Sequence, residues 1–218
     1  MKKIKYLLFF IILFSLFIIK SNDSYKVQYK DINDFDELTY TNLYKEYNNN
    51  NNIKAFLRLE NNIIPIVQGN DNEFYLNHDI NDNENYKGSV YLDYRNNIKK
   101  DKKLIIYGHS DYNNEVPFTV LNDKNFYENN KKFYLYTEYK DYELEIFSTY
   151  IEKNDYTYMN LENFNDKTYK EHLEYLKNKS EINYNIDINE NKLVVILQTC
   201  DINNSAFRLV MGIEKDHT

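Results

Sequence analysis

The stretch Leu193–Val194–Val195–Ile196–Leu197–Gln198–Thr199–Cys200 decides the fold of this chain. It opens with five consecutive apolar residues, three of them β-branched, which is typical of a buried strand. The only cysteine in the sequence ends the stretch, and Arg208 stands eight residues later at the head of a second apolar run, Leu209–Met211. The pattern predicts a thiol at the mouth of one core strand and a permanent cation at the start of the next.

Two interpretations of Cys200 follow from this position. A single cysteine beside a core strand is usually a small buried hydrophobe without chemical function. A thiolate nucleophile instead needs a positive environment and partial exposure at the edge of a rigid element. This stretch alone favours the inert cysteine, so a catalytic role requires further evidence from the rest of the chain.

The composition indicates a globular protein. A length of 218 residues suits one domain with a sizeable core plus appendages, and the 42% hydrophobic and 28% charged content excludes a disordered chain. The net charge of −7 argues against nucleic-acid binding, because no basic stripe is available to neutralise phosphates. One cysteine excludes an internal disulfide and multi-cysteine zinc sites. We find no metal-ligand cluster and expect no cofactor.

Residues 1–20 have the pattern of a membrane anchor or signal segment. Three lysines within the first five residues precede the apolar run Tyr6–Ile19, which is broken only by Ser15. The run is apolar on all faces, unlike a helix packed on a core, and no small-x-small cleavage site follows it. We therefore expect an uncleaved anchor in the cell membrane. The positive flank should stay in the cytoplasm and place the remaining chain on the extracytoplasmic face.

The rest of the chain divides into a connecting region and a β domain. Residues 21–52 are expected to form a linker and an amphipathic helix over Asp31–Tyr47, followed by an asparagine-rich loop. Residues 53–218 are expected to form a barrel domain of short strands, with one helix over Asp166–Leu176. The expected strands are Ile53–Leu59, Ile63–Val67, Gly88–Tyr94, Lys103–Tyr107, Phe133–Thr137, Tyr142–Tyr150, Leu193–Thr199 and Phe207–Ile213. Because no regular helices alternate with these strands, the pattern predicts a mainly β fold, a small antiparallel or mixed barrel.

His109 is the histidine best placed for chemistry. It follows the apolar strand Lys103–Tyr107 and Gly108, so it lies at the rim of the predicted sheet, where a rigid strand can hold a reactive group. The other three histidines, His78, His172 and His217, are expected at the solvated surface. Scattered acids such as Asp71, Asp93 and Asp201 are likewise expected in turns and at the surface.

Cys200, His109 and Arg208 together are more specific than any one of them. Each stands at the end of a predicted strand, and a barrel can bring such ends to one rim. A cysteine needs a base or a cationic partner to become a nucleophile. An arginine can stabilise the oxyanion of a tetrahedral intermediate or hold the substrate backbone. The alternative for Arg208 is a surface ion pair with one of the many acids.

An ordered series of motifs resembles the class B sortases. Thr199–Cys200 followed by Arg208 is similar to the T-C and arginine signature of that family. The other segments that resemble it are Phe56–Leu59, Pro65–Gly69, Asp71–Asn72, Tyr75–Leu76, Gly88–Asn96 and Ile106–His109, followed by an echo at Phe118, Leu121 and Phe126–Tyr127. The resemblance runs from about residue 53 to residue 213. Three positions depart from it: Ser110 replaces a common asparagine, Gln198 replaces a frequent serine, and Pro117 interrupts the segment after His109.

The resemblance implies a sortase-like eight-stranded β-barrel with an N-terminal helix and a helix in the connection before the seventh strand. It also implies a cysteine transpeptidase of Gram-positive bacteria without a cofactor or metal. Cys200 would be the nucleophile, His109 the general acid/base, and Arg208 the cation that stabilises the oxyanion or positions the substrate. The implied partners are secreted proteins bearing a C-terminal sorting signal, cleaved after threonine, and a cell-wall peptide amine as acceptor. The departures lie near the expected groove, so they bear on the substrate motif more than on the chemistry.

Two other functions remain open at this point. A membrane-anchored cysteine peptidase would use the same residues and pass the acyl group to water. A non-catalytic surface binding module on the same barrel would keep Cys200 buried and unreactive. Product analysis with and without an added amine distinguishes the peptidase from a transpeptidase. The pH dependence of thiol alkylation distinguishes the binding module from an enzyme with an activated cysteine.

Overall fold

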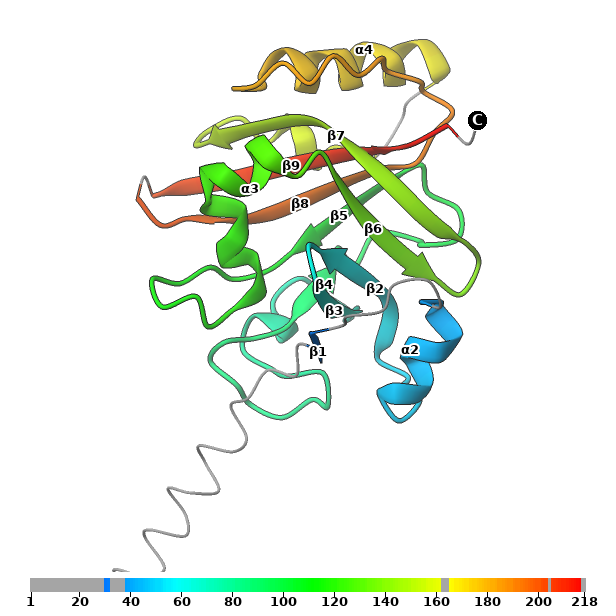
Figure 1. The fold of residues 1–218 in the computed structure, drawn as a ribbon, viewed down its shortest axis with the longest axis vertical. Coiled ribbons are helices and arrows are strands. Elements are labelled where there is room, and N and C mark those ends of the chain that lie inside the picture. Colours follow the sequence, from blue (N-terminus) through cyan, green and yellow to red (C-terminus); the bar gives the residue numbers. More distant parts are fainter. Residues whose placement is uncertain (1–29, 32–37, 162–164, 204, 217–218) are drawn as a thin grey trace, which may run out of the picture.

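The computed structural model describes residues 30–31, 38–161, 165–203 and 205–216 (Figure 1). Its strands are β1 Lys30–Asp31, β2 Ile53–Leu59, β3 Asn62–Val67, β4 Val90–Leu92, β5 Lys103–Tyr107, β6 Lys132–Thr137, β7 Asp141–Glu152, β8 Val194–Asp201 and β9 Ala206–Glu214. The α-helices are α2 Tyr40–Glu46, α3 Lys124–Asn129 and α4 Asp166–Asn178, and the 3₁₀ helices are η1 Phe74–Leu76, η2 Pro117–Asn122 and η3 Thr157–Met159. The strands expected from the sequence are thus present, with boundaries shifted by a few residues.

The strands close into a barrel. Their order is β1-β3-β2-β6-β7-β9-β8-β5-β4, and β4 also pairs with β3. That last pairing closes the eight strands β2 to β9 on themselves and leaves the two-residue β1 as an addition at β3. The β3–β4 and β5–β8 pairs are parallel and the other pairs are antiparallel. The predicted mainly β fold with an eight-stranded barrel is therefore confirmed.

Alternate residues along the strands supply two apolar clusters. The interior cluster takes residues from all eight barrel strands and is completed by η2 and α3; its members include Leu57, Ile66, Leu92, Ile106, Leu135, Ile146, Leu197, Val210, Phe118 and Phe126. The outer cluster lies beneath α2 and α4 and includes Leu43, Phe56, Ile105, Tyr107, Leu173, Leu176, Ile196 and Met211. A side chain on β8 or β9 therefore faces either the barrel interior or the outer surface near α4, according to its place in the alternation.

The helix expected over Asp166–Leu176 is confirmed as α4, which lies over β7 at the top of Figure 1. Asn165 begins it with a capping box to Thr168, and Tyr169, Leu173 and Leu176 form its buried face. The described helix near the N-terminus is shorter than expected. It starts at Tyr40, because Thr39 caps it by accepting a hydrogen bond from the Asn42 N–H, whereas Asp31 pairs with β3 as a strand.

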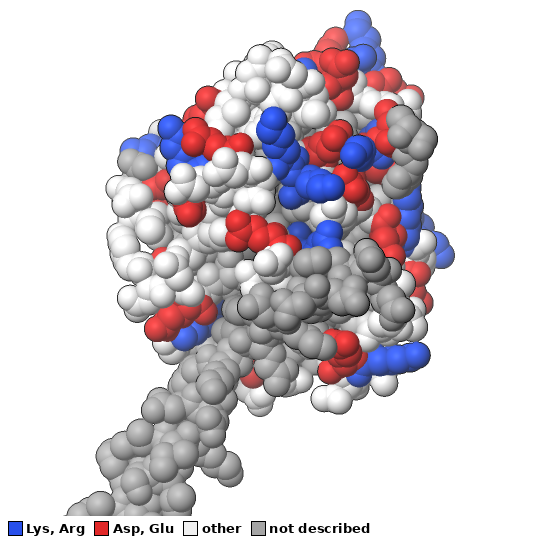
Figure 2. Space-filling view, viewed as in Figure 1, with Lys and Arg blue, Asp and Glu red and all other residues white. Residues whose placement is uncertain are grey.

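The expected anchor at residues 1–20 lies outside the described residues, as do residues 21–29 of the expected linker. None of the described helices has the length and apolar character needed to cross a membrane. On the face of the barrel shown in Figure 2, basic and acidic side chains are interspersed over the surface rather than gathered into one-sign areas.

Candidate active site

The parallel pairing of β5 and β8 brings His109 beside Cys200. Tyr107 is the register partner of Gln198, and the Gly108 N–H donates to the Gln198 carbonyl at 3.1 Å. Extending this register by two residues sets His109 against Cys200, because parallel strands advance together and their side chains alternate in step. On this register both residues belong to the face that Ile196 occupies in the outer cluster.

The close approach of the two strands before His109 requires glycine at position 108, because the surrounding side chains leave no room for a Cβ there. A Cβ placed at Gly108 would lie 2.7 Å from the Phe118 ring and 3.1 Å from Val90 Cγ2. The hydroxyl of Thr199 donates to the Gly108 carbonyl at 2.8 Å. The residue before His109 is thereby tied to the residue before Cys200.

Cys200 is exposed, as a nucleophile must be, so the expectation of a buried and inert cysteine is not met. Its register partner across the hairpin is Phe207, whose ring packs edge-on against Tyr156 at 6.4 Å between centroids. Although the residue as a whole is exposed, neighbouring groups partly shield the sulfur from water, and this desolvation raises the pKa of the thiol above its ordinary value. The resting thiol is therefore protonated at neutral pH and requires a base to become a nucleophile.

His109 can supply that base. Its Nε2 lies 2.7 Å from the main-chain carbonyl of Leu76. Because a carbonyl oxygen only accepts hydrogen bonds, Nε2 carries a proton. In the neutral imidazole the lone pair then belongs to Nδ1, which is the atom able to accept the proton of the thiol.

Arg208 leaves the hairpin on the other face. It is the register partner of Thr199, not of Cys200, and it continues the alternation of Val210 into the interior cluster. Its Nη1 donates to Glu181 Oε2 at 2.9 Å, its Nη2 lies 3.9 Å from Asp201 Oδ2, and its guanidinium lies over the Tyr127 ring at 5.2 Å. The continued register thus sets the backbones of His109 and Cys200 side by side, whereas the buried guanidinium lies behind the strand. There it pairs with Glu181, whose side chain is partly exposed, so the ion pair that the sequence left open for Arg208 is present at the edge of the surface.

The outer face leading to Cys200 is lined by tyrosines. Gln198, two residues before Cys200 on the same face, accepts a hydrogen bond from the Tyr158 hydroxyl at 2.8 Å. The Tyr107 and Tyr91 rings pack with centroids 5.2 Å apart. Tyr158 lies in η3, far from any motif in the sequence, so only the fold identifies it as part of this face.

Two acids expected at the surface are buried. Asp93 is fully buried and accepts hydrogen bonds from the Tyr107 hydroxyl at 2.7 Å and from Arg95 at 2.8–2.9 Å. Burial alone would raise the pKa of Asp93, but these hydrogen bonds together hold it below its usual value. Asp201 is buried beside Arg208. Both expectations were wrong because each carboxylate lies against an arginine, Arg95 or Arg208, which compensates its charge where water is excluded.

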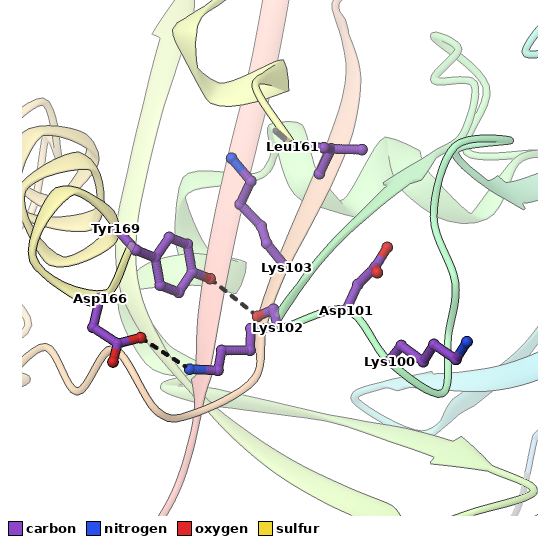
Figure 3. Close-up of a pocket in the computed structure, with 7 residues that line it drawn as sticks. All are labelled: Lys100, Asp101, Lys102, Lys103, Leu161, Asp166 and Tyr169. Carbon is purple, nitrogen blue, oxygen red and sulfur yellow. Dashed lines mark hydrogen bonds and ion pairs between the residues drawn. The ribbon is translucent and has the colours of Figure 1, made fainter. Parts of the chain in front are cut away.

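His172, also expected at the surface, lies on the buried face of α4 next to Lys103. The two side chains approach to 2.8 Å, and the Lys103 ammonium also donates to the main-chain carbonyls of Tyr158 and Asn160. Burial and the nearby lysine lower the pKa of His172 to about 4, and burial lowers that of Lys103 to about 7. Beside Lys103, at the start of β5, lies a cavity of about 290 Å³ whose lining includes Tyr169 and Asp166 (Figure 3). It lies at the opposite end of β5 from His109, so it does not belong to the thiol site.

Comparison with known proteins identifies the family. No family model matches the chain. The solved structure of Clostridium perfringens sortase B is 31% identical with a TM-score of 0.71, over 79% of this chain and 99% of that one. The chain belongs to the sortase B family. The sortase B–substrate complex of Staphylococcus aureus matches with 27% identity and a TM-score of 0.70, over 80% of this chain and 85% of that one.

The sequence match to a full-length member of the family is shorter. Curated sortase B of Staphylococcus aureus (strain NCTC 8325 / PS 47) is 33% identical over 141 residues, which are 63% of this chain. The match spans only 57% of the length of that relative. Among the described residues of this sortase B family member, no group of three or more His, Cys, Asp or Glu side chains could hold a metal ion.

Proposed function

We propose that the chain is a cysteine transpeptidase that cleaves a C-terminal sorting motif after threonine and transfers the acyl group to an amine. The observation that carries the proposal is the β5–β8 register, because its continuation by two residues sets His109 opposite the exposed Cys200. Membership of the sortase B family supports it, as does the substrate complex solved for the Staphylococcus aureus relative.

The chemistry proceeds in two acyl transfers. In the first, Cys200 sulfur attacks the threonine carbonyl carbon while His109 Nδ1 takes the thiol proton. The tetrahedral intermediate then expels the amine of the next residue, which leaves with the proton held by His109, and a thioester remains on Cys200. In the second, an acceptor amine attacks the thioester, its proton passes to His109, and the sulfur departs and recovers that proton. One amide is exchanged for another without an external oxidant or reductant.

Arg208 is the proposed cation for the oxyanion. In the resting structure its guanidinium is held by Glu181 and Asp201 on the interior side of the hairpin. To reach the oxyanion, the guanidinium has to leave Glu181 and turn around the end of β8. The Glu181 side chain is 42% exposed, and an ion pair with an exposed member is weak, so substrate binding can displace it.

The proposed substrates are secreted proteins with a C-terminal sorting signal, and the proposed acceptor is a cell-wall peptide amine of a Gram-positive bacterium. Residues 1–20 would anchor the chain in the cell membrane. Residues 21–52 would connect the anchor to the catalytic domain, residues 53–218, on the extracytoplasmic face. Localising the chain in membrane and wall fractions of its host tests this placement; recovery from the cytoplasm would contradict it.

The reaction is tested by incubating the purified full chain with a library of threonine-containing sorting peptides, with and without triglycine as an acceptor. We expect cleavage after threonine and, with triglycine, a ligated product identified by mass spectrometry. Hydrolysis that triglycine does not divert would favour the peptidase. The matched control is Cys200→Ala, because it removes only the sulfur at an exposed position. Equal cleavage by that variant, or no cleavage of any peptide, would refute the proposal.

A further inference from the structure

Two side chains bind the main-chain carbonyl of Cys200. The Ser110 hydroxyl donates to it at 2.5 Å, and the Asn122 side-chain amide donates to it at 3.0 Å. This carbonyl lies beyond the last register pair of β5 with β8, where the Gly108 N–H binds the Gln198 carbonyl. In the continued ladder the next donor would be the N–H of residue 110. The Ser110 hydroxyl takes that place.

The Ser110 bond has a counterpart on the other side of His109. Thr199, immediately before Cys200, donates its hydroxyl to the carbonyl of Gly108, immediately before His109. Ser110, immediately after His109, donates its hydroxyl to the carbonyl of Cys200. One hydroxyl–carbonyl bond therefore lies on each side of His109. Together the two bonds set the spacing between the chain segment that carries the imidazole and the strand that carries the thiol.

Asn122 is held in place by the packed 3₁₀ helix η2. It ends η2, whose Phe118 and Leu121 are fully buried in the interior cluster. The Asn122 Oδ1 atom is buried and has no hydrogen-bond partner among the described residues. A buried acceptor without a partner is unfavourable, so the donation to Cys200 is the contact for which this side chain is oriented.

We propose that Ser110 and Asn122 are positioning residues of the reaction, which hold the end of β8 so that the Cys200 sulfur stays within reach of His109. This inference rests on the proposed function. A proton moves from sulfur to nitrogen only over hydrogen-bond distance, so a small displacement of the strand end separates the pair. Ser110 is also one of the three positions at which the chain departs from the family pattern, and here it has a specific contact.

The test compares Ser110→Ala and Asn122→Asp with the wild-type chain. The first removes one donor, and the second places a carboxylate oxygen against the carbonyl. Ser110→Thr keeps a hydroxyl and should restore the wild-type values. Ser148→Ala is the matched control, because it removes a hydroxyl–carbonyl bond of the same kind, 2.8 Å long, from Ser148 to Leu176. Ser148 lies on β7, away from the end of β8 that carries Cys200.

Two measurements are made at a temperature where all variants are folded by circular dichroism. The rate of Cys200 alkylation by iodoacetamide against pH needs no substrate, and kcat and KM are measured on a cleaved peptide. Ser110→Ala and Asn122→Asp should slow alkylation at neutral pH, because the imidazole that takes the thiol proton is displaced from the sulfur. They should lower kcat about tenfold or more with little change in KM, since displacements of about an ångström are this costly.

The outcomes separate the inference from the proposed function. Slower alkylation of both variants at neutral pH, in a chain that cleaves no peptide, supports the positioning role and refutes the transpeptidase. Unchanged alkylation and kcat in both variants, in a chain that does cleave, overturn the positioning role and leave the transpeptidase standing. If Ser148→Ala changed alkylation and kcat as much as Ser110→Ala does, the positioning role would also be overturned, because the effect would then reflect a general loss of stability.

Discussion

Replacing Gly108 with alanine should damage both the fold and the reaction. The added Cβ would lie 2.7 Å from Phe118 Cδ2 and 2.8 Å from Phe118 Cγ, closer than packed carbons approach. Phe118 is fully buried in the interior cluster and cannot swing away, so the backbone before His109 has to move. Overpacking of this kind costs roughly 1–3 kcal/mol of unfolding free energy. For a chain of this size that lowers Tm by roughly 2–12 °C.

The same movement should separate His109 from Cys200. Gly108 donates its N–H to Gln198 and accepts the Thr199 hydroxyl, so both ties between the strands are strained by the displacement. A misplacement of about 1 Å costs up to about 100-fold in rate, and we expect kcat/KM to fall by that order. Thermal unfolding by circular dichroism and peptide cleavage measure the two effects.

Gly69→Ala is the control for this prediction. A Cβ at Gly69 would lie 3.3 Å from the nearest atom, the Asp71 carbonyl oxygen, so the neighbour needs to move only slightly. Neither Gly69 nor Gly108 has a positive φ, so alanine changes the entropy of the unfolded chain equally in the two variants. The reasoning is refuted if Gly108→Ala loses no more stability than Gly69→Ala, or if it unfolds at lower temperature but cleaves peptide at the wild-type rate.

Two further predictions concern Glu181, which pairs with Arg208, and the buried His172. Glu181→Gln should raise kcat/KM by about 1.4- to fivefold, because it removes an ion pair worth about 0.2–1 kcal/mol that restrains Arg208 in the resting state; a loss of activity would show that the pair itself is needed. Because the pKa of His172 is lowered to about 4 in the folded chain, the unfolded chain binds more protons than the folded chain between about pH 6.5 and pH 4. The free energy of unfolding therefore decreases as the pH falls through this window, by a few kcal/mol. His172→Gln should flatten this part of a urea-denaturation pH series, and a series as steep as the wild type would contradict the prediction.

Much of the fold follows from local sequence pattern. The apolar run before Cys200 was predicted as a strand over Leu193–Thr199 and is observed as Val194–Asp201. The spacing of apolar residues predicted α4, whose buried face has the expected side chains. These predictions succeed because periodicity and β-branching act within a few residues of the chain. The predicted helix over Asp31–Tyr47 was too long, because a cap at Thr39 and strand pairing at Asp31 outweigh the periodicity there.

The residues of the candidate site were also predicted from the sequence: one cysteine after a core strand, and one histidine after another strand with glycine between. Only the tertiary structure decided which side chains face one another. The parallel β5–β8 register sets His109 beside Cys200, whereas the antiparallel β8–β9 register turns Arg208 to the interior. The burial of His172 and Asp93 is likewise imposed by residues far away in sequence, Lys103 beneath α4 and Tyr107 on β5. Alternation along a strand says that neighbouring side chains point apart, but which face becomes buried depends on what the rest of the chain packs against it.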